Sequence, residues 1–333
     1  MDNLSIIIQG SFGTKFFPEC QVLTGLKRMR LFFPMAEIIF STWSDGEAND
    51  LVRKSKLQKM NVILVINDDP GQIVVESNGI KYANNVNRLI VSSSSGLERA
   101  TRPYAIKMRS DCFLSDDKIK YILRQFIMSG AILRRNEAYS VFSSRLICSS
   151  LVARDARGSL PYLFHPSDFF LAGHIDDLRL FFSAPLATLS IFNPSFSPGL
   201  WSAWKYVPEQ WLWVNAIRMK KGIQVYDGNF KSSQLIYLSE QYFLANFISF
   251  DTRQLSLCWP KYYKKYIFRG LFSLYSHSRW IGLYRRHHSM IESRTGECLL
   301  TLLIKIWRTG YCLRACLLKI SVVRVFLRRH FLR

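Results

Sequence analysis

The sequence predicts an α/β fold with a mostly parallel central sheet, helices on both faces and a basic helical extension at the C-terminus. Three observations predict it. Short apolar runs alternate with helix-length segments through the first 128 residues, four of these runs end in small, amide or acidic residues, and the charge pattern changes near residue 252. With 333 residues, 49% of them hydrophobic, the chain is long enough for one large domain and an appendage.

The alternation begins with Leu4–Gln9, an apolar run closed by Gly10, which predicts a buried first strand. Three further strands are predicted, at Ala36–Thr42, Asn61–Ile66 and Tyr104–Met108. Helices are predicted between them, at Glu19–Phe32, Ala48–Leu57 and Asp117–Met128. The segment Asn84–Leu97 predicts the start of a helix followed by a Ser-rich turn at a glycine.

After Asn136 the alternation is weaker. One strand is predicted at Leu146–Ala153, and shorter helical segments are predicted at Phe164–Phe182, Pro208–Lys220 and Glu240–Phe247. The uncharged stretch Phe181–Trp204 contains three prolines, which would break a membrane-spanning helix. We interpret this stretch as a buried loop region.

Most of the positive charge lies at the C-terminal end. The formal net charge is +21, and residues 252–333 carry 17 Lys and Arg against two acidic residues, a net of +15. We therefore divide the chain into a domain of residues 1–251 and a basic extension of residues 252–333. A charge of this size indicates an anionic partner, which can be a membrane, a nucleic acid or a phosphorylated ligand.

Polar residues follow four of the predicted strands. Ligands of open α/β sheets bind beyond the carboxyl ends of the strands, so these residues are binding candidates. They are Gln9, Gly10, Thr42, Trp43, Asp68, Asp69 and Asp111, with Lys107 and Arg109 just before the last. Asp111 offers a carboxylate to a divalent cation such as Mg²⁺ or Mn²⁺, and Lys107 and Arg109 offer positive charge to a phosphate. For Asp68 and Asp69, turn formation is an equal alternative.

Seven segments follow one another in a fixed order: QG, AEIIFSTW, NDDPG, NNVNRLIVSSSSGLERA, YAIKMRSD, HPSDFFLAG and PEQWLW. Together they resemble the WavE lipopolysaccharide-synthesis family over roughly residues 4 to 250, and the chain after about residue 252 lies outside the resemblance. The resemblance implies a Rossmann-like glycosyltransferase of the GT-A type. Such an enzyme would transfer a sugar from a nucleotide-sugar donor to the lipopolysaccharide core or another polysaccharide acceptor of the bacterial cell envelope.

The resemblance also implies which residues bind the donor. Arg109-Ser110-Asp111 stands where an Asp-X-Asp metal motif is expected, which makes Asp111 the metal ligand. Arg109 replaces the first carboxylate, so Arg109 could take over part of the phosphate neutralisation. Asn87 and Arg88 lie in the helical segment that the resemblance assigns to donor binding.

Two later acidic residues are implied to act on the acceptor side. Asp168 is a candidate for catalysis or for binding sugar hydroxyls, with helix capping as the alternative. Glu209 follows Pro208 at a predicted helix start, where an acidic residue is also favoured by the helix dipole alone. By the resemblance Glu209 is the general base that takes the proton of the acceptor hydroxyl, which implies inversion at the anomeric carbon.

The C-terminal extension predicts an interfacial helix. Its cations scatter around a helical wheel, so no clean amphipathic stripe is expected; they are Lys305, Arg308, Arg314, Lys319 and Arg324. No uncharged run is long enough for a spanning helix, whereas a helix lying on anionic lipid fits the composition. The N-terminal MDNLSIII lacks a basic region, so no signal peptide is expected. We expect a cytoplasmic protein in peripheral contact with the inner face of the cytoplasmic membrane, near a lipid-linked acceptor.

Two alternatives remain open at the level of sequence. A non-catalytic basic protein that binds membrane or nucleic acid would explain the charge, although no nucleic-acid-binding motif is recognisable and none is expected as a partner. Transfer of a phosphosugar would use the same fold and would differ in leaving phosphate in the product.

Overall fold

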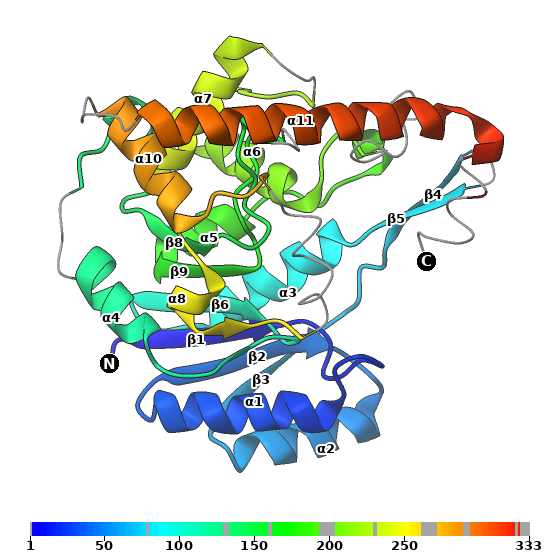
Figure 1. Ribbon diagram of the computed structural model, residues 1–333. Coiled ribbons are helices and arrows are strands. Elements are labelled where there is room, and N and C mark those ends of the chain that lie inside the picture. The colour runs from blue at the N-terminus through cyan, green and yellow to red at the C-terminus, as the bar shows by residue number, and fades with distance from the viewer. Residues whose placement is uncertain are drawn as a thin grey trace.

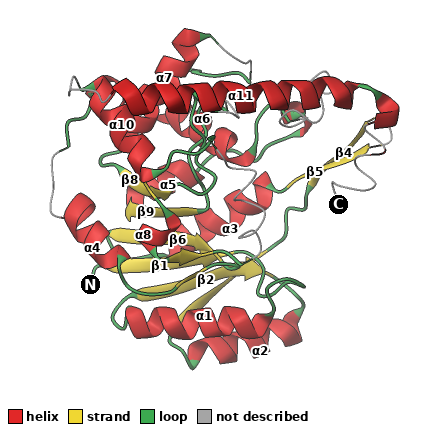
Figure 2. Cartoon of the chain, viewed as in Figure 1, coloured by secondary structure: helices red, strands yellow, loops and turns green. Residues whose placement is uncertain are grey.

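A computed structural model of the chain describes residues 2–77, 80–128, 133–158, 162–192, 204–228, 232–260, 272–288, 294–323 and 326. Its central sheet is built from β1 (Leu4–Gln9), β2 (Glu37–Trp43), β3 (Val62–Asn67), β6 (Tyr104–Arg109), β8 (Leu146–Ser149), β9 (Phe170–His174) and β10 (Phe247–Phe250). The strand order is β10-β8-β9-β6-β1-β2-β3, with helices on both faces (Figures 1 and 2). Only β9 runs antiparallel to its neighbours in this sheet. The predicted α/β fold with a mostly parallel sheet is confirmed.

The first four parallel strands form where the sequence predicts them. β1 is buried along its whole length, as expected for a strand covered on both faces. In the register of the sheet, Gln9 pairs with Ser41 on β2 and with Arg109 on β6. The carboxyl ends of these strands therefore meet at one edge of the sheet.

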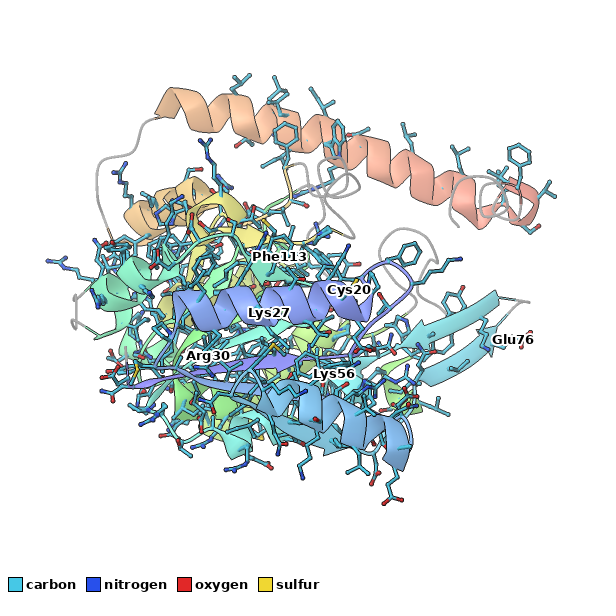
Figure 3. The ribbon with its side chains drawn as sticks, turned by 90° about the horizontal axis from the view of Figure 1, so that it is seen from below. Cys20, Lys27, Arg30, Lys56, Glu76 and Phe113 are labelled. Atoms are coloured by element: carbon cyan, nitrogen blue, oxygen red, sulfur yellow. The ribbon has the colours of Figure 1, made fainter. Side chains whose placement is uncertain are left out.

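Four helices cover the two faces of this sheet: α1 (Glu19–Phe32), α2 (Glu47–Gln58), α3 (Val86–Arg99) and α5 (Ile175–Phe182). Helices α1 and α2 lie together on one face, and α3 and α5 lie on the other (Figure 1). Lys56 Nζ lies 2.6 Å from Glu19 Oε1 and connects α2 to α1, and the Arg28 guanidinium lies over the Phe113 ring (Figure 3).

Helix α3 runs unbroken through the segment where the sequence predicts a turn, so that prediction is wrong. A Cβ at Gly96 would lie 2.6 Å from Ile7 Cγ2, so glycine here allows the helix to lie close to the sheet. Ser92, Ser94 and Ser95 donate their hydroxyls to backbone carbonyls four residues earlier. Hydroxyls satisfied in this way are compatible with a helix.

Strands account for two further differences from the prediction. β4 (Ile73–Ser77) and β5 (Ile80–Asn84) form an antiparallel hairpin that projects from the body of the molecule (Figure 1). Phe170–His174, inside a segment predicted as helical, forms β9 between β6 and β8. Its residues 170–173 are buried, and pairing with two neighbouring strands outweighs any local preference.

The rest of the first 260 residues adds short elements: β7 (Phe113–Leu114), α4 (Ile119–Leu123), a π-helix (Arg124–Met128), 3₁₀ turns (Glu137–Tyr139, Leu189–Ile191), α6 (Pro208–Lys221), α7 (Ser233–Asn246), α8 (Thr252–Leu255) and β11 (Leu257–Cys258). The helix predicted from residue 208 is thus present as α6, and the helix predicted for 117–128 is divided into α4 and the π-helix. Within the predicted loop region Phe181–Trp204, residues 193–203 lie outside the described ranges.

The C-terminal part contains α10 (His277–His287) and α11 (Arg294–Lys319), and α11 runs across the end of the molecule where α6, α7 and α10 lie (Figure 1). Residues beyond 251 pack against the earlier ones: β11 pairs with β7, and Trp280 Nε1 donates to the Phe247 carbonyl at 2.8 Å. The division of the chain at residue 251 stays a prediction that rests on the change in charge.

Helix α11 exposes large apolar side chains along one side. They recur every three to seven residues, at Leu299, Leu302, Ile306, Leu313, Leu317 and Ile320, and we call them the apolar stripe. On the other side, Ile304 is 6% exposed and Arg308 points into the molecule. The expectation that the cations of this helix line no single face stays a prediction, and the side that the structure distinguishes is the apolar one. Residue 324 lies outside the described residues. No helix of the described ranges combines the length and apolar composition needed to cross a membrane.

Candidate functional site

The candidate site lies where the carboxyl ends of β1 and β6 meet. Gln9 and Arg109 are register partners at this edge, and the Ser110 amide donates to the Gln9 carbonyl at 2.8 Å. Gly10 has φ +125°, and a Cβ on it would lie 2.8 Å from Ser110 Oγ. Only glycine suits this backbone conformation without strain. The turn after β1 is thereby held against the turn after β6.

Arg109 and Asp111 form a two-pronged ion pair at the end of β6. Arg109 Nε lies 2.8 Å from Asp111 Oδ1, and Arg109 Nη2 lies 2.8 Å from Oδ2. Trp259 adds a hydrogen bond from Nε1 to Oδ2 at 3.1 Å, and its ring lies 5.4 Å from the Arg109 guanidinium. Burial would raise the pKa of Asp111, but hydrogen bonds and charge from Arg109 outweigh it and lower the pKa. Asp111 is therefore a stable carboxylate.

The surroundings of Asp111 do not form a ready metal site. Both carboxylate oxygens accept hydrogen bonds from Arg109, so a cation would have to replace a guanidinium contact. The described ranges contain no group of three His, Cys, Asp or Glu side chains that could hold a metal ion. Mg²⁺ usually needs one or two free carboxylates besides substrate phosphates. The divalent cation and the metal-ligand role of Asp111 stay predictions.

Lys107 is completely buried on the same strand. Its ammonium donates to the backbone carbonyl of Asp168 at 2.8 Å and lies 4.6 Å from the centre of the Phe182 ring. Burial lowers the pKa of Lys107 to about 8, against the opposing charge of Asp168. A direct contact of Lys107 with donor phosphates does not fit this arrangement, because the side chain has no exposed surface. Lys107 instead holds the backbone that presents Asp168.

Glu209 stands in the first turn of α6. Pro208 begins the helix, and Gln210 secures the turn by accepting from the Val207 amide and donating to the Leu163 carbonyl. The Glu209 side chain is 14% exposed, and its Oε2 lies 3.7 Å from His165 Nε2. Burial and then the charge of Asp168 raise the pKa of Glu209 to about 8. A carboxyl with such a pKa can exchange a proton near neutral pH.

His165 does not compensate Glu209 with a positive charge. Burial, and then the nearby Arg154, lower the pKa of His165 to about 3, so the imidazole is neutral at pH 7. Its Nδ1 is buried without a hydrogen-bond partner among the described residues. The 3.7 Å separation from Glu209 is also longer than a hydrogen bond. The imidazole of His165 therefore supplies no positive charge to stabilise the ionised form of Glu209.

The structure brings the predicted residues of β6 near two later acids, Asp168 and Glu209. The charge of Asp168 acts on both Lys107 and Glu209, and the charge of Arg109 also acts on Glu209. Such interactions require the groups to lie near one another. Asp168 itself is 8% exposed at the start of the turn into β9. One region therefore contains a carboxyl with a raised pKa, a second acid and a charged pair.

The remaining predicted donor residues follow β1, β2 and β3. The Gln9 side-chain oxygen lies 2.7 Å from Ser92 Oγ, and the Thr42 carbonyl accepts from the Asn67 side chain at 2.8 Å. Thr42 is 1% exposed, whereas Trp43 is half-buried. These contacts fix the strand ends, and only Trp43 offers substantial side-chain surface beside them.

The polar residues after β3 mostly contact one another. Arg88 Nε donates to Asp69 Oδ1 at 2.7 Å, and Asp69 also accepts from the Gly71 amide, as expected of a turn residue. Asn87 uses its amide for two bonds to the backbone of Ala187. Asp68 is exposed. Donor binding by these four residues stays a prediction, and for Asp69 the turn-forming alternative is present in the structure.

Sequence reasoning missed the aromatic residues of this region. Trp259 lies 148 positions after Asp111, in the basic part that the resemblance left out, so no local pattern linked the two. Phe169 packs against Trp259 with ring centres 4.3 Å apart. The HPSDFF segment, which precedes β9, was the one available signal, since it places Phe169 next to Asp168.

Comparison with solved structures finds weak likenesses. A cytidylyltransferase from Leptospira borgpetersenii is 12% identical, with a TM-score of 0.31 over 56% of this chain and 66% of that one. Mouse xyloside xylosyltransferase 1 is 11% identical, with a TM-score of 0.30 over 66% and 82%. Residues 1–349 of Staphylococcus aureus TarS are 11% identical, with a TM-score of 0.30 over 74% and 57%. Likenesses of this size carry no argument about function. No curated protein matches the sequence.

The family described as WavE lipopolysaccharide synthesis matches residues 4–309. The match includes every predicted site residue. It extends beyond residue 250, where the resemblance seen in the sequence motifs ends. It also covers Trp259, α10 and more than half of α11. The chain belongs to the WavE lipopolysaccharide synthesis family.

Proposed function

We propose that the protein is a glycosyltransferase that moves a sugar from a nucleotide-sugar donor to a saccharide of the lipopolysaccharide or of another surface polysaccharide. One observation carries the proposal: Glu209 is a carboxyl with a pKa near 8 and lies near enough to Arg109, the partner of Asp111 at the end of β6, to be affected by its charge. Sugar transfer needs a base for the acceptor hydroxyl and positive charge for the departing diphosphate. This edge offers both, and family membership supports the reading.

In the proposed reaction, the ionised Glu209 takes the proton of an acceptor hydroxyl. The oxygen of that hydroxyl attacks the anomeric carbon, and the bond from this carbon to the diphosphate breaks. The bonding electron pair leaves with the nucleoside diphosphate, whose growing negative charge Arg109 stabilises. Attack from the face opposite the leaving group inverts the anomeric carbon. Asp168 is placed to accept hydrogen bonds from sugar hydroxyls.

The apolar stripe of α11 supports a membrane-bound acceptor. The stripe projects away from the rest of the molecule (Figure 3). Exposed apolar side chains on a helix in a chain of net charge +21 fit the interface of an anionic bilayer. We propose that α11 lies on the inner face of the cytoplasmic membrane and brings the site near a lipid-linked saccharide.

The test compares lipopolysaccharide from cells without the gene, complemented with the wild type, Glu209→Gln or Glu98→Gln. Glu98 is an exposed glutamate on α3 and serves as the matched control. We expect mass spectrometry to show one missing sugar unit in the deletion strain and in Glu209→Gln, at equal protein levels.

Wild-type and Glu98→Gln should restore the full mass. A full-length glycan made with Glu209→Gln would contradict the role of Glu209. An unchanged glycan in the deletion strain would instead favour a non-catalytic basic protein. A missing mass that includes phosphate would point to phosphosugar transfer.

A further inference from the structure

A second cationic region lies away from the sheet edge, between α7, α10 and α11. A cavity of about 370 Å³ opens there. Five cationic side chains line it: Arg157, Arg279, Arg286, Lys305 and Arg308. They come from segments far apart in the sequence, so no single charge run predicts their convergence. We call this feature the cationic cavity.

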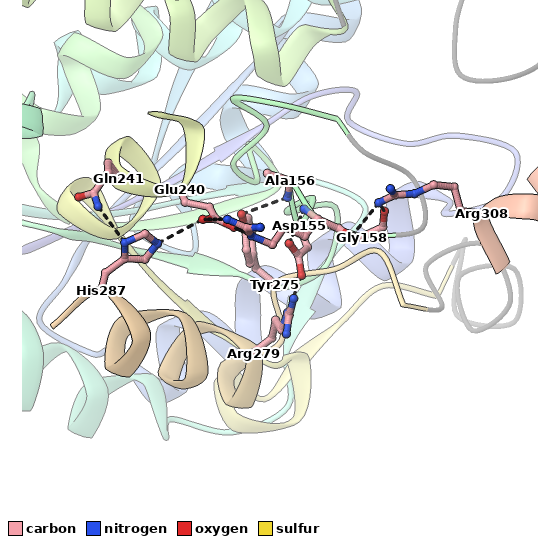
Figure 4. Close-up of polar contacts among 10 residues, drawn as sticks. Asp155, Ala156, Gly158, Glu240, Gln241, Tyr275, Arg279, His287 and Arg308 are labelled. Atoms are coloured by element: carbon pink, nitrogen blue, oxygen red, sulfur yellow. Dashed lines mark hydrogen bonds and ion pairs between the residues drawn. The ribbon is translucent and has the colours of Figure 1, made fainter. Parts of the chain in front are cut away.

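Two buried acids hold part of the wall of the cationic cavity in place. Arg279 Nε lies 2.6 Å from Asp155 Oδ2, and Arg157 lies 2.5 Å and 3.0 Å from the two oxygens of Glu240 (Figure 4). Asp155 and Glu240 are almost completely buried behind these arginines. Asp155 and Glu240 thus offset Arg279 and Arg157, whereas Lys305 and Arg308 form no ion pair within the described ranges, so the lining keeps positive charge.

Arg308 and Lys305 bring α11 into this wall. Arg308 Nη2 donates to the carbonyls of Arg157 and Gly158 at 2.9 Å and 2.8 Å, which ties α11 to the chain at residues 157–158 (Figure 4). Arg308 Nε is buried without a hydrogen-bond partner among the described residues. Lys305 is exposed at the same wall and forms no ion pair within the described ranges. The Lys305 ammonium is therefore left for a ligand.

We propose that the cationic cavity binds a phosphate group. Arginine forks and ammonium groups that converge on one point recognise phosphate oxygens by short charge-assisted hydrogen bonds. The volume suits one phosphorylated group with its neighbouring atoms. Ile236 and Ile304 add apolar surface for the part of the ligand attached to the phosphate.

The position of the cationic cavity makes a lipid headgroup one source of this phosphate. Lys305 is next to Ile306 and three residues from Leu302, so the opening borders the apolar stripe. If the stripe enters the bilayer interface, the cavity lies at the level of lipid phosphates. A free phosphorylated ligand is the other source with the same chemistry. The proposal does not depend on sugar transfer, because no step of that reaction uses these residues.

A short segment of the chain connects the cationic cavity to the candidate catalytic site. Arg154, which lowers the pKa values of His165 and Glu209, lies three residues before Arg157 of the cavity wall. The intervening Asp155 holds Arg279.

The experiment uses the full chain with Lys305→Gln, and with Arg314→Gln as the matched control. Arg314 is on the same helix, about 14 Å further along its axis. One arm measures inorganic phosphate binding by calorimetry. The other measures co-sedimentation with phosphatidylcholine vesicles containing phosphatidylglycerol, against pure phosphatidylcholine. We expect Lys305→Gln to weaken binding about five- to tenfold in at least one arm, and Arg314→Gln less than twofold.

The two arms identify the source of the phosphate. Weakening only with vesicles assigns the cavity to a lipid headgroup, and weakening only with inorganic phosphate assigns it to a free ligand. Weakening in both supports a general phosphate site. Equal losses in the two variants, or none in either, would overturn the proposal. Melting temperatures within one or two degrees of wild type show that a loss is not due to unfolding.

Discussion

The end of β6 and the start of α6 each present a largely buried carboxyl group, and the two groups are in opposite electrostatic states. Asp111 has its charge matched by Arg109 and by the indole N–H of Trp259, and its pKa is lowered. Glu209 is buried beside Asp168, with a neutral histidine as its neighbour, and its pKa is raised to about 8. Environments that separate two pKa values in this way assign different tasks to two acids.

The difference arises from what each segment can contribute locally. β6 carries its own cation two residues before Asp111, so the strand supplies charge and countercharge together. α6 begins with Pro208 and offers Glu209 a backbone amide of its first turn. This amide and the charges of Arg154 and Arg109 lower the pKa less than burial and Asp168 raise it. A compensated acid suits binding of a charged group, whereas an uncompensated acid suits proton transfer.

Of the proposed variants, we expect Arg109→Ala to lower the transfer rate most. It removes the cation from the donor side and leaves Asp111 buried without its partner. We expect the rate of nucleoside diphosphate release to fall about 10²- to 10³-fold, as on losing a group that stabilises a leaving charge. Arg109→Lys should recover only part, since an ammonium cannot reproduce the two-pronged contact. The rates are measured with the donor identified from the missing glycan mass.

Removal of divalent cations serves as the control for this interpretation. If Arg109 carries most of the neutralisation, EDTA should lower the rate less than Arg109→Ala does. Complete loss of activity with EDTA, restored by Mg²⁺ or Mn²⁺, would return Asp111 to its predicted role as a metal ligand. That result would also mean that donor binding separates Asp111 from Arg109.

The pH dependence of the transfer rate tests the role of Glu209. A general base acts only when ionised, and the pKa of Glu209 is about 8. We therefore expect kcat/KM to rise about tenfold per pH unit below pH 8 and to level off above it. Lys107 has a pKa near the same value, so Lys107→Met should retain the profile if Glu209 is responsible. A profile that is flat between pH 6 and 9 would exclude Glu209 as the base.

The sequence predicts some features of the fold and of the candidate site, and it misses others. The parallel strands, the polar strand ends and the helix start at Pro208 follow from local patterns in the sequence. The pairing of Arg109 with Asp111 was within reach, because the two residues are two positions apart. The burial of Lys107 and the contact of Trp259 with Asp111 were not, because each depends on segments at least 61 positions away. β9 was missed for the same reason, since its pairing with β6 and β8 is tertiary.

Stability provides a measure that does not depend on the substrate. Because the pKa of Glu209 is raised on folding, the folded state binds the extra proton between about pH 4.5 and pH 8, and this group's contribution to stability is lost as the pH rises through that range. Glu209→Gln stays neutral and should escape this loss. We expect it to exceed wild type in free energy of unfolding by about 1–3 kcal/mol at pH 8.5, with little difference at pH 4.5.

Chemical denaturation at the two pH values gives these free energies, with Glu98→Gln as the control. Because Glu98 is exposed, its replacement should change stability equally at both pH values. A Glu209→Gln protein that is less stable than wild type at pH 8.5 would show that the ionised carboxylate is well compensated. The contrast with Asp111 would then disappear.

We expect the smallest effect on stability and rate from Trp259→Phe. This variant tests the hydrogen bond to Asp111. The substitution keeps an aromatic ring near Arg109 and Phe169 and removes the hydrogen bond from Nε1 to Asp111 Oδ2. Arg109 still binds both oxygens of Asp111, so the loss should be about 1 kcal/mol in the free energy of unfolding, with a few-fold slower transfer. Trp259→Ala removes the ring as well and should cost more, about 3 kcal/mol. Equal losses in the two variants would mean that the hydrogen bond, and not the packing of the ring, holds the pair in place.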